Sequence, residues 1–337
     1  MPKFSISNRR YTGSKSKLID WINRSIQSHT KSASLSFADI FAGTGVVAAN
    51  NTDSFKEIII NDFLHSNNVI YKGFFEKGHW SEKKIINYVK SYEDLTTKSL
   101  KENYFSRNFG GKFYSLQDAK IIGFIREDIE RNQSDLTAKE SNILLASLLY
   151  SADKAANTVG HYDAYRIRPD IEDRFEFKLI QPIHCKATVS IYREDANKLV
   201  RKINPDLIYI DPPYNSRQYS RFYHVLENLA QWKKPELFGV AMKPEPENMS
   251  EYCKVAAFDN FSDLIANISS KKIIVSYNNT YNSKSSSSKN KISHEQILSV
   301  LSDKGSTEEL SIEHAHFNAG KTNFSDHREF LFITTVA

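Results

Sequence analysis

Residues 35–65 hold a strand, a glycine turn, a helix and a second strand in immediate succession. The first strand, 35–41, is largely apolar and runs into Gly43-Thr44-Gly45, which breaks a regular strand. Val46 to Ala49 can begin a helix, and the apolar run 58–60 supplies the second strand. Because a helix joins them, we expect the two strands to lie parallel. The segment therefore predicts half of a doubly wound sheet.

Four later apolar runs extend this sheet, at 187–192, 207–210, 273–277 and 330–333. The last run is far enough from its predecessor to form an antiparallel hairpin. Between 67 and 182 the pattern is helical and rich in aromatic residues, as in 118–132 and 140–152. We therefore expect an α/β fold with a mostly parallel, Rossmann-like sheet. The predicted catalytic domain comprises 1–66 and 183–337, and an inserted, mainly helical domain occupies 67–182.

The composition excludes several classes of protein. Hydrophobic residues make up 40% and charged residues 25% of the 337 residues, as in ordinary globular enzymes. No apolar run reaches the roughly 18 residues of a membrane span, and no secretory signal begins the sequence, so we expect a bacterial cytoplasmic protein. Cys185 and Cys253 are the only cysteines, and their separation predicts neither a disulfide framework nor a metal site. The net charge of +5 fits a polyanionic partner but does not require one.

The glycine turn has the pattern of a nucleotide-binding loop. Asp62 follows the second strand, where a carboxylate can meet a ribose hydroxyl. Asp39 lies inside the first strand, where a dinucleotide site is normally apolar, and no lysine follows the glycines to make a phosphate-binding Walker loop. Asp39 can hold an ammonium group, which S-adenosylmethionine carries and a nicotinamide dinucleotide lacks. The alternative is that Asp39 caps the turn and binds nothing.

A second motif follows the apolar strand 207–210: Asp211, Pro212, Pro213 and Tyr214. In open α/β sheets ligands bind beyond the carboxyl ends of the strands. The amino nitrogen of adenine is a poor nucleophile because its lone pair is delocalised into the ring. Asp211 and a backbone carbonyl beside the prolines can each accept one amino hydrogen, and the Tyr214 ring can stack on the base. Such a pocket predicts methylation of an adenine flipped out of the duplex.

With these motifs the chain resembles the Dam-like (D12 class, α group) adenine-specific DNA methyltransferases of type II restriction-modification systems. The resemblance implies that Asp211 to Tyr214 are the catalytic residues and that S-adenosylmethionine is the cofactor. It also implies a set of cofactor-binding residues: Tyr11, Lys15, Asp39, Phe41, Gly43, Gly45, Asp62, Asp195 and Asp211. Arg328 to Leu331 resembles a late motif of the family, without an assigned role. The order of the motifs implies that the target recognition domain lies between Asp62 and Asp195.

Four residues are candidates for contact with DNA: Asn157, His161, Arg217 and Tyr219. Asn157 and His161 belong to a stretch that recurs in the restriction-associated branch, but a helix cap and a surface histidine explain them equally well. Arg217 and Tyr219 follow the catalytic motif and can contact a phosphate or the flipped base. They can also pack beneath it, because Leu226 and its apolar neighbours mark the next helix as core-facing.

The leading prediction is therefore a site-specific DNA adenine methyltransferase. An RNA adenine or guanine amino methyltransferase and a non-catalytic nucleic-acid-binding protein are the alternatives. The expected partner is double-stranded DNA with a short recognition sequence, which the sequence does not reveal. A cognate restriction endonuclease is the expected functional partner, and a single set of motifs suggests a monomer.

Overall fold

The computed structural model describes residues 3–30, 36–97, 99–280, 286, 289–313 and 327–337. It divides into two compact units. One unit, here called the helical unit, comprises Met1–Ser14, Leu64–Cys185 and Ser220–Glu247. The other, the sheet unit, comprises Lys15–Phe63, Lys186–Tyr219 and Asn248–Ala337.

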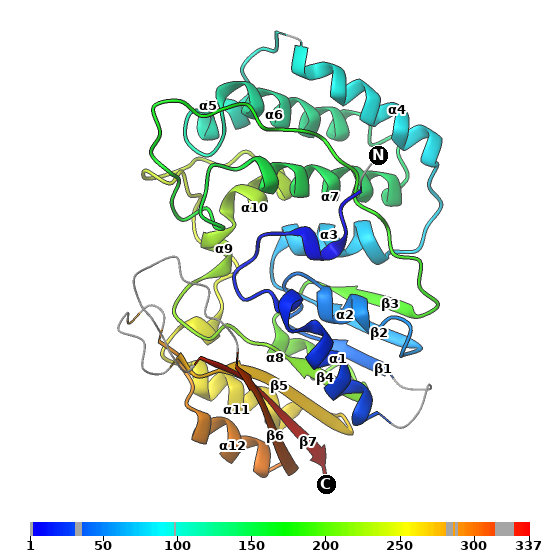
Figure 1. Cartoon of the computed structure of the whole chain (residues 1–337), viewed down its shortest axis with the longest axis vertical. Helices are drawn as coiled ribbons and strands as arrows, with labels where there is room; N and C mark the ends of the chain where they lie inside the picture. The colour runs from blue at the N-terminus through cyan, green and yellow to red at the C-terminus, as the bar shows by residue number, and fades with distance from the viewer. Residues whose placement is uncertain (1–2, 31–35, 98, 281–285, 287–288, 314–326) are drawn as a thin grey trace. The chain divides into compact units, whose positions relative to one another are not determined.

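The sheet unit is built on one seven-stranded sheet (Figure 1). Its strands are β1 (Ser36–Asp39), β2 (Glu57–Asn61), β3 (Thr188–Tyr192), β4 (Leu207–Ile210), β5 (Lys272–Asn278), β6 (Gly305–Glu313) and β7 (Arg328–Val336). They are arranged in the order β3-β2-β1-β4-β5-β7-β6. The first five are mutually parallel, whereas β7 runs antiparallel to both β5 and β6. The predicted mostly parallel α/β fold is confirmed, and the last strand runs antiparallel to β5 as predicted. Its hairpin partner, however, is β6, which the sequence analysis did not predict. Leu35 lies outside the described residues.

Helices cover this sheet because alternate side chains of each buried strand point to opposite faces. Those of the sheet unit are α1 (Ile19–Ser28), α2 (Val46–Asn50), α8 (Ala196–Leu199), α11 (Ala257–Asn267) and α12 (His294–Ser302), with the short 3-10 helices η2 (Lys15–Lys17) and η4 (Glu251–Cys253). Ala38, Ile208 and Ile273 share one core with residues of α8, α11 and α12. On the other face Phe37 packs against Phe55. Helices α1 and α2 lie on the face opposite α11 and α12 (Figure 1).

The helical unit contains the predicted helices of the middle region. Its elements are η1 (Ile6–Asn8), α3 (His65–Phe75), α4 (Glu82–Glu93), η3 (Asp94–Thr97), α5 (Tyr104–Phe109), α6 (Leu116–Arg131), α7 (Ala138–Ala155) and α10 (His224–Gln231); α9 (Tyr219–Phe222) begins one residue before the unit does. The Thr137 hydroxyl caps α7 and the Glu140 side chain returns to the Thr137 N–H, which forms a capping box. Helix α3 packs closely on α7, because Gly73 leaves room for Ala146.

Helix α10 joins the helical unit although it follows the Asp-Pro-Pro-Tyr motif in the chain. Val225, Leu226 and Leu229 are fully buried, as the core-facing pattern predicted. The Glu227 carboxylate accepts hydrogen bonds from the backbone N–H groups of His65, at 3.0 Å, and Ser66, at 2.8 Å. These are donors at the start of α3 that no helical carbonyl can satisfy, so Glu227 caps α3 from a distant part of the sequence.

No helix among the described residues is long and apolar enough to cross a membrane. Within the same residues, no three His, Cys, Asp or Glu side chains are grouped closely enough to hold a metal ion. Cys185 and Cys253 are not joined in a disulfide.

Candidate active site

The carboxyl edge of the parallel strands collects the acidic residues that the sequence singled out. Asp39 of β1 pairs in register with Ile60 of β2 and Tyr209 of β4. Asp62 and Asp211 each lie two residues beyond those partners. All three carboxylates therefore lie at one edge of the sheet, as parallel pairing requires.

The glycine turn between β1 and α2 depends on two left-handed residues. Gly43 has φ 53° and Gly45 has φ 76°, a conformation that side chains with a Cβ rarely adopt. The Gly43 N–H donates to Asp62 Oδ2 at 3.0 Å, and the Ala42 N–H donates to the Asn61 carbonyl at 2.9 Å. These bonds fix the turn against the end of β2.

Asp39 is a buried acceptor with nothing to accept from. Its side chain is 1% exposed, and neither carboxylate oxygen has a hydrogen-bond partner among the described residues. Burial and then the charge of Asp211 raise the pKa of Asp39 well above its usual value, and the nearby Ala48 N–H opposes the rise without a well-formed hydrogen bond. A cationic or hydrogen-donating ligand would relieve this destabilisation.

Asp211 is held by a lysine and a tyrosine. Lys15 Nζ lies 3.3 Å from Asp211 Oδ1 and 3.2 Å from Glu329 Oε2. The Tyr214 hydroxyl donates to the same Asp211 Oδ1 and accepts from Lys15 Nζ. Both of these contacts, from Lys15 and from Tyr214, are made to Oδ1 of Asp211.

The charges in this cluster set the protonation of both partners. Burial raises the pKa of Asp211 to about 6, Lys15 and the Tyr214 hydroxyl oppose the rise, and Glu329 adds to it. Burial disfavours the charge on Lys15, but Asp211 and Glu329 outweigh it and raise the pKa of Lys15. The cluster thus pairs one lysine with two carboxyl groups, those of Asp211 and Glu329.

The remaining residues of the Asp-Pro-Pro-Tyr motif shape the loop after β4. Pro212 is buried and Pro213 is half-buried. The Tyr214 ring meets the Tyr277 ring edge-on, with centroids 4.8 Å apart, and its carbonyl accepts from the Lys291 N–H at 2.8 Å. Tyr214 is thus anchored by its ring and by its backbone.

The other predicted cofactor-binding residues do not all belong to the same unit. Phe41 is half-buried and packs edge-on against Tyr252. Asp195 caps α8 by accepting from the Lys198 N–H at 3.2 Å. Tyr11 belongs to the helical unit, where its ring stacks on Tyr223 with centroids 4.7 Å apart.

Arg9, which was not among the predicted site residues, lies in this aromatic cluster of the helical unit. It is 6% exposed, and its guanidinium lies 4.9 Å from the Tyr11 ring centroid and 5.5 Å from that of Tyr223. It also donates to Asn67 Oδ1. Cation–π contact on a stacked pair fixes the Tyr11 ring in place. The only sequence signal for Arg9 is its position two residues before Tyr11. Nothing in the neighbouring sequence indicates that its side chain is buried.

The four candidate DNA-binding residues are divided between the units. In the helical unit, buried Asn157 donates through Nδ2 to the carbonyls of Lys112, at 3.0 Å, and Arg166, at 2.8 Å. The half-buried His161 ring stacks on Phe222. In the sheet unit, Arg217 and Tyr219 are both partly exposed. Asn157 therefore supports the backbone of the loop that follows it.

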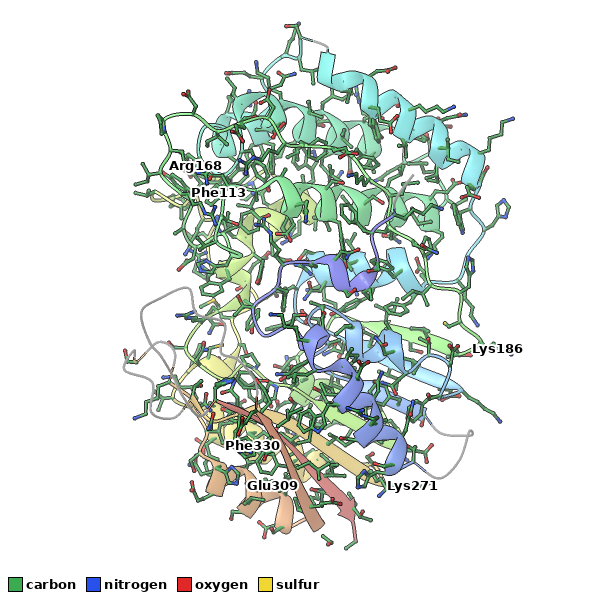
Figure 2. All side chains as sticks on the ribbon, in the orientation of Figure 1. Phe113, Arg168, Lys186, Lys271, Glu309 and Phe330 are labelled. Carbon is green, nitrogen blue, oxygen red and sulfur yellow. The ribbon has the colours of Figure 1, made fainter. Side chains whose placement is uncertain are left out.

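That loop is exposed from Arg166 to Asp170, and this exposed run begins with Arg166, Ile167 and Arg168. Ile167 is 94% exposed, which is unusual for so large an apolar side chain. A bridge between Thr158 and Tyr165 holds the base of the loop. Figure 2 shows Arg168 at the margin of the helical unit, outward from buried Phe113.

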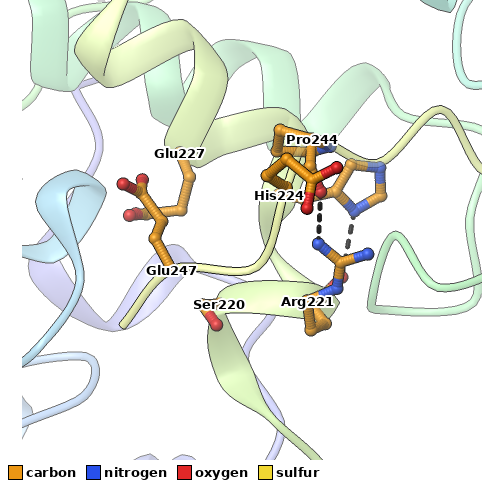
Figure 3. Close-up of a pocket in the computed structure, with 7 residues that line it drawn as sticks. Ser220, Arg221, His224, Glu227, Pro244 and Glu247 are labelled. Atoms are coloured by element: carbon orange, nitrogen blue, oxygen red, sulfur yellow. Dashed lines mark hydrogen bonds between the residues drawn. The ribbon is translucent and has the colours of Figure 1, made fainter. Parts of the chain in front are cut away.

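A small pocket of the helical unit contains none of the predicted site residues (Figure 3). It is lined by Ser220, Arg221, His224, Glu227, Pro244, Glu245 and Glu247. Burial lowers the pKa of His224 to about 4, so this imidazole is neutral near pH 7. Three glutamates and one arginine make the lining acidic, which does not suit a nucleic-acid phosphate.

The fold and this edge define a class of protein: doubly wound α/β enzymes that bind a ligand beyond the carboxyl ends of parallel strands. Residues 11–292 match the family model for D12 class N6 adenine-specific DNA methyltransferases. The chain belongs to this family, as the sequence predicted.

Several curated proteins are similar over most of the chain. The type II methyltransferase M.CviAII of Paramecium bursaria Chlorella virus 1 is 32% identical over 97% of this chain and 98% of its own length. The modification methylase StsI of Streptococcus sanguinis is 36% identical over 80% of this chain and 44% of its own. The type II methyltransferase M.FokI of Planomicrobium okeanokoites is 30% identical over 96% and 52%. The chain thus spans nearly all of the first relative and about half of the other two.

Proposed function

We propose that the protein transfers a methyl group from S-adenosylmethionine to the N6 amino group of an adenine flipped out of duplex DNA. The observation that carries the proposal is the pair of carboxylates at one sheet edge: Asp39, whose two oxygens have no hydrogen-bond partner among the described residues, and Asp211, whose Oδ1 is held by Lys15 and Tyr214. Family membership supplies the adenine and the DNA.

The acidic edge fits the proposed cofactor. S-adenosylmethionine carries an ammonium and a sulfonium, and when bound it supplies an electrophilic methyl group. Asp39 would pair with the ammonium, which gives its buried carboxylate the missing donor. Asp62 accepts a hydrogen bond from the Gly43 N–H and would also accept from the ribose hydroxyls of the cofactor. Asp195 would contact the adenine ring of the cofactor. Tyr11, Lys15, Phe41 and the turn glycines complete the proposed cofactor-binding set.

Asp211 would act on the target base. Its Oδ2 would accept one amino hydrogen and a carbonyl of Pro212 or Pro213 the other, so that the nitrogen lone pair leaves the ring plane. The nitrogen then forms its bond to the methyl carbon as the carbon–sulfur bond breaks, and one amino proton departs through Asp211 or to water. Tyr214 would stack on the flipped base. The methyl transfer would be accelerated by the positioning of the reactants and by the electrostatic field of the site, and no covalent enzyme intermediate would form.

The inserted domain predicted at 67–182 would act as the target recognition domain. The exposed Arg166 and Arg168 fit DNA phosphates, and Asn157 positions them by holding the loop backbone. His161, Arg217 and Tyr219 remain candidates for contact with DNA. We propose that the enzyme acts as a monomer in the bacterial cytoplasm and protects host DNA alongside a cognate restriction endonuclease.

The test is to incubate plasmid DNA with the protein and labelled S-adenosylmethionine and to locate the modified bases by sequencing. Methyladenine in one short sequence context supports the proposal. Asp211→Asn, which keeps the shape of the side chain, should abolish transfer while cofactor binding by calorimetry persists. Labelling of structured RNA but not of DNA would refute the proposed substrate, and full turnover by Asp211→Asn would refute the proposed chemistry.

A further inference from the structure

Glu329 is a buried carboxylate at the beginning of β7. Because β7 is antiparallel to β5, it begins at the edge where the parallel strands end. Glu329 pairs in register with Asn278, the last residue of β5. The side chain is 7% exposed, and a carboxylate so buried needs a cationic partner. The lysine that serves it, Lys15, is 314 positions away in the sequence.

Lys15 divides its three protons among three acceptors. Its ammonium contacts Glu329 Oε2 at 3.2 Å, Asp211 Oδ1 at 3.3 Å and the Tyr214 hydroxyl. A lysine ammonium has three donors, so the set is complete. The pull of Glu329 on one side balances the pull of Asp211 on the other.

We propose that Glu329 is a positioning residue for methyl transfer, which acts through Lys15 to keep the ammonium on Oδ1 of Asp211 and away from Oδ2. This inference rests on the proposed function of Asp211. Without the charge on Glu329, Lys15 is attracted to one carboxylate alone and moves onto it. The ammonium then competes with the target amino group for the acceptor, and Asp211 becomes a weaker hydrogen-bond acceptor.

The charged and titratable groups that face Asp211 come from several elements. They are Lys15 of η2, Asp39 of β1, Tyr209 of β4, Tyr214 of the same loop and Glu329 of β7. Glu329 raises the pKa of Asp211. If activity requires ionised Asp211, it is lost as the pH falls through this pKa. Removing the charge at position 329 lowers the pKa, so the acid limb of the rate profile moves to lower pH.

The experiment is single-turnover methyl transfer to a duplex over about pH 5 to 9, with the variants Glu329→Gln and Glu329→Asp. Glu329→Gln should lower the transfer rate about 10- to 100-fold at neutral pH, as misplacement of a reacting group does, and shift the acid limb downward. Glu329→Asp keeps the charge on a shorter side chain and should recover part of the rate and the wild-type limb. Cofactor binding by calorimetry should change little in either variant.

Glu57→Gln is the matched control, since it neutralises an exposed glutamate at the amino end of β2. It should keep both the rate and the profile. A purely structural role for Glu329 would lower the thermal midpoint without moving the acid limb, and this outcome overturns the inference. So does an unchanged rate in a folded Glu329→Gln protein. Glu329→Gln could fail to fold, and Glu329→Asp then decides. The shorter side chain places the carboxylate farther from the Lys15 ammonium, so a full wild-type transfer rate in Glu329→Asp would also overturn the inference. Failure of the wild-type protein to methylate any duplex would instead refute the proposed function.

Discussion

Asp39→Asn should stabilise the ligand-free protein and weaken its cofactor binding at the same time. Asp39 is buried without a hydrogen-bond partner among the described residues, and the charge of Asp211 raises its pKa. A buried polar group without a partner costs about 1–3 kcal/mol, and a charged one costs more. Asparagine also lacks a partner here, but it removes the additional cost of the charge and the repulsion from Asp211. Since 1 kcal/mol moves Tm by roughly 2–4 °C in a domain of about 150–250 residues, the variant should melt several degrees higher.

The pH dependence of this gain has a definite sign. The pKa of Asp39 is raised in the folded protein, so the wild type is destabilised at pH values above the folded pKa. The destabilisation fades as the pH falls towards the unfolded pKa of about 3.9, where the carboxyl is protonated in both states. The advantage of Asp39→Asn should therefore be largest in neutral and alkaline buffer and shrink in acid.

With S-adenosylmethionine most of this advantage should be lost. A ligand at 100 times its Kd stabilises the folded protein by about 2.7 kcal/mol. Losing one partner of a buried charge pair costs about 2 kcal/mol or more, which weakens binding about 30-fold or more. Thermal unfolding with and without the cofactor measures both effects in one titration.

Asp53→Asn is the control for this experiment, because Asp53 is exposed in the turn after α2. It should leave both the ligand-free Tm and the cofactor-induced shift unchanged. A lower ligand-free Tm in Asp39→Asn, together with an undiminished cofactor-induced shift, would refute the reasoning.

Three further predictions concern other parts of the molecule. Tyr214→Phe removes a hydrogen bond that lowers the pKa of Asp211, so the acid limb of the rate profile should move to higher pH. The double change Arg166→Ala and Arg168→Ala should reduce the slope of log Kd for duplex DNA against log salt by about 2, as each lost phosphate contact reduces it by about 0.9. Glu227→Ala leaves two backbone N–H groups of α3 without their acceptor and should destabilise the protein by about 1–2 kcal/mol in urea unfolding.

Each of these has a control. For DNA binding it is the double change Lys83→Ala and Lys90→Ala, which removes the same charge from the exposed side of α4 and should retain the slope. For the helix cap it is Glu245→Ala, which removes an exposed glutamate from the pocket of Figure 3. An acid limb that stays in place in Tyr214→Phe would mean that its hydroxyl does not act on Asp211. A salt slope equal to that of the wild type would place Arg166 and Arg168 away from phosphates.

Much of the sheet could be predicted because several of its strands are short apolar runs. The strands β1, β2, β4 and β5 are buried on both faces, so their apolar character is continuous. Strand β6 could not be predicted in this way. Its residues alternate between half-buried and exposed, and pairing with β7 is what makes Gly305–Glu313 a strand.

The division into units depended on packing that the sequence does not display. Met1–Ser14 and Ser220–Glu247 join the helical unit, although both flank motifs of the sheet unit. The Glu227 carboxylate of α10 caps α3. The apolar pattern of α10 predicts that the helix is buried, but it does not predict which element the helix packs against. Which surface a core-facing helix meets is a non-local property.

The sequence by itself determined which carboxylates end the strands. Asp39, Asp62 and Asp211 occupy these positions because local apolar patterns define each strand, and parallel pairing brings strand ends together. The tertiary structure decided which charges meet. Lys15 lies between Asp211 and Glu329 because the sheet order β4-β5-β7 and the antiparallel direction of β7 bring the beginning of the last strand to the carboxyl edge. Coulomb interaction and desolvation depend on distance and burial in space, and separation along the chain predicts neither.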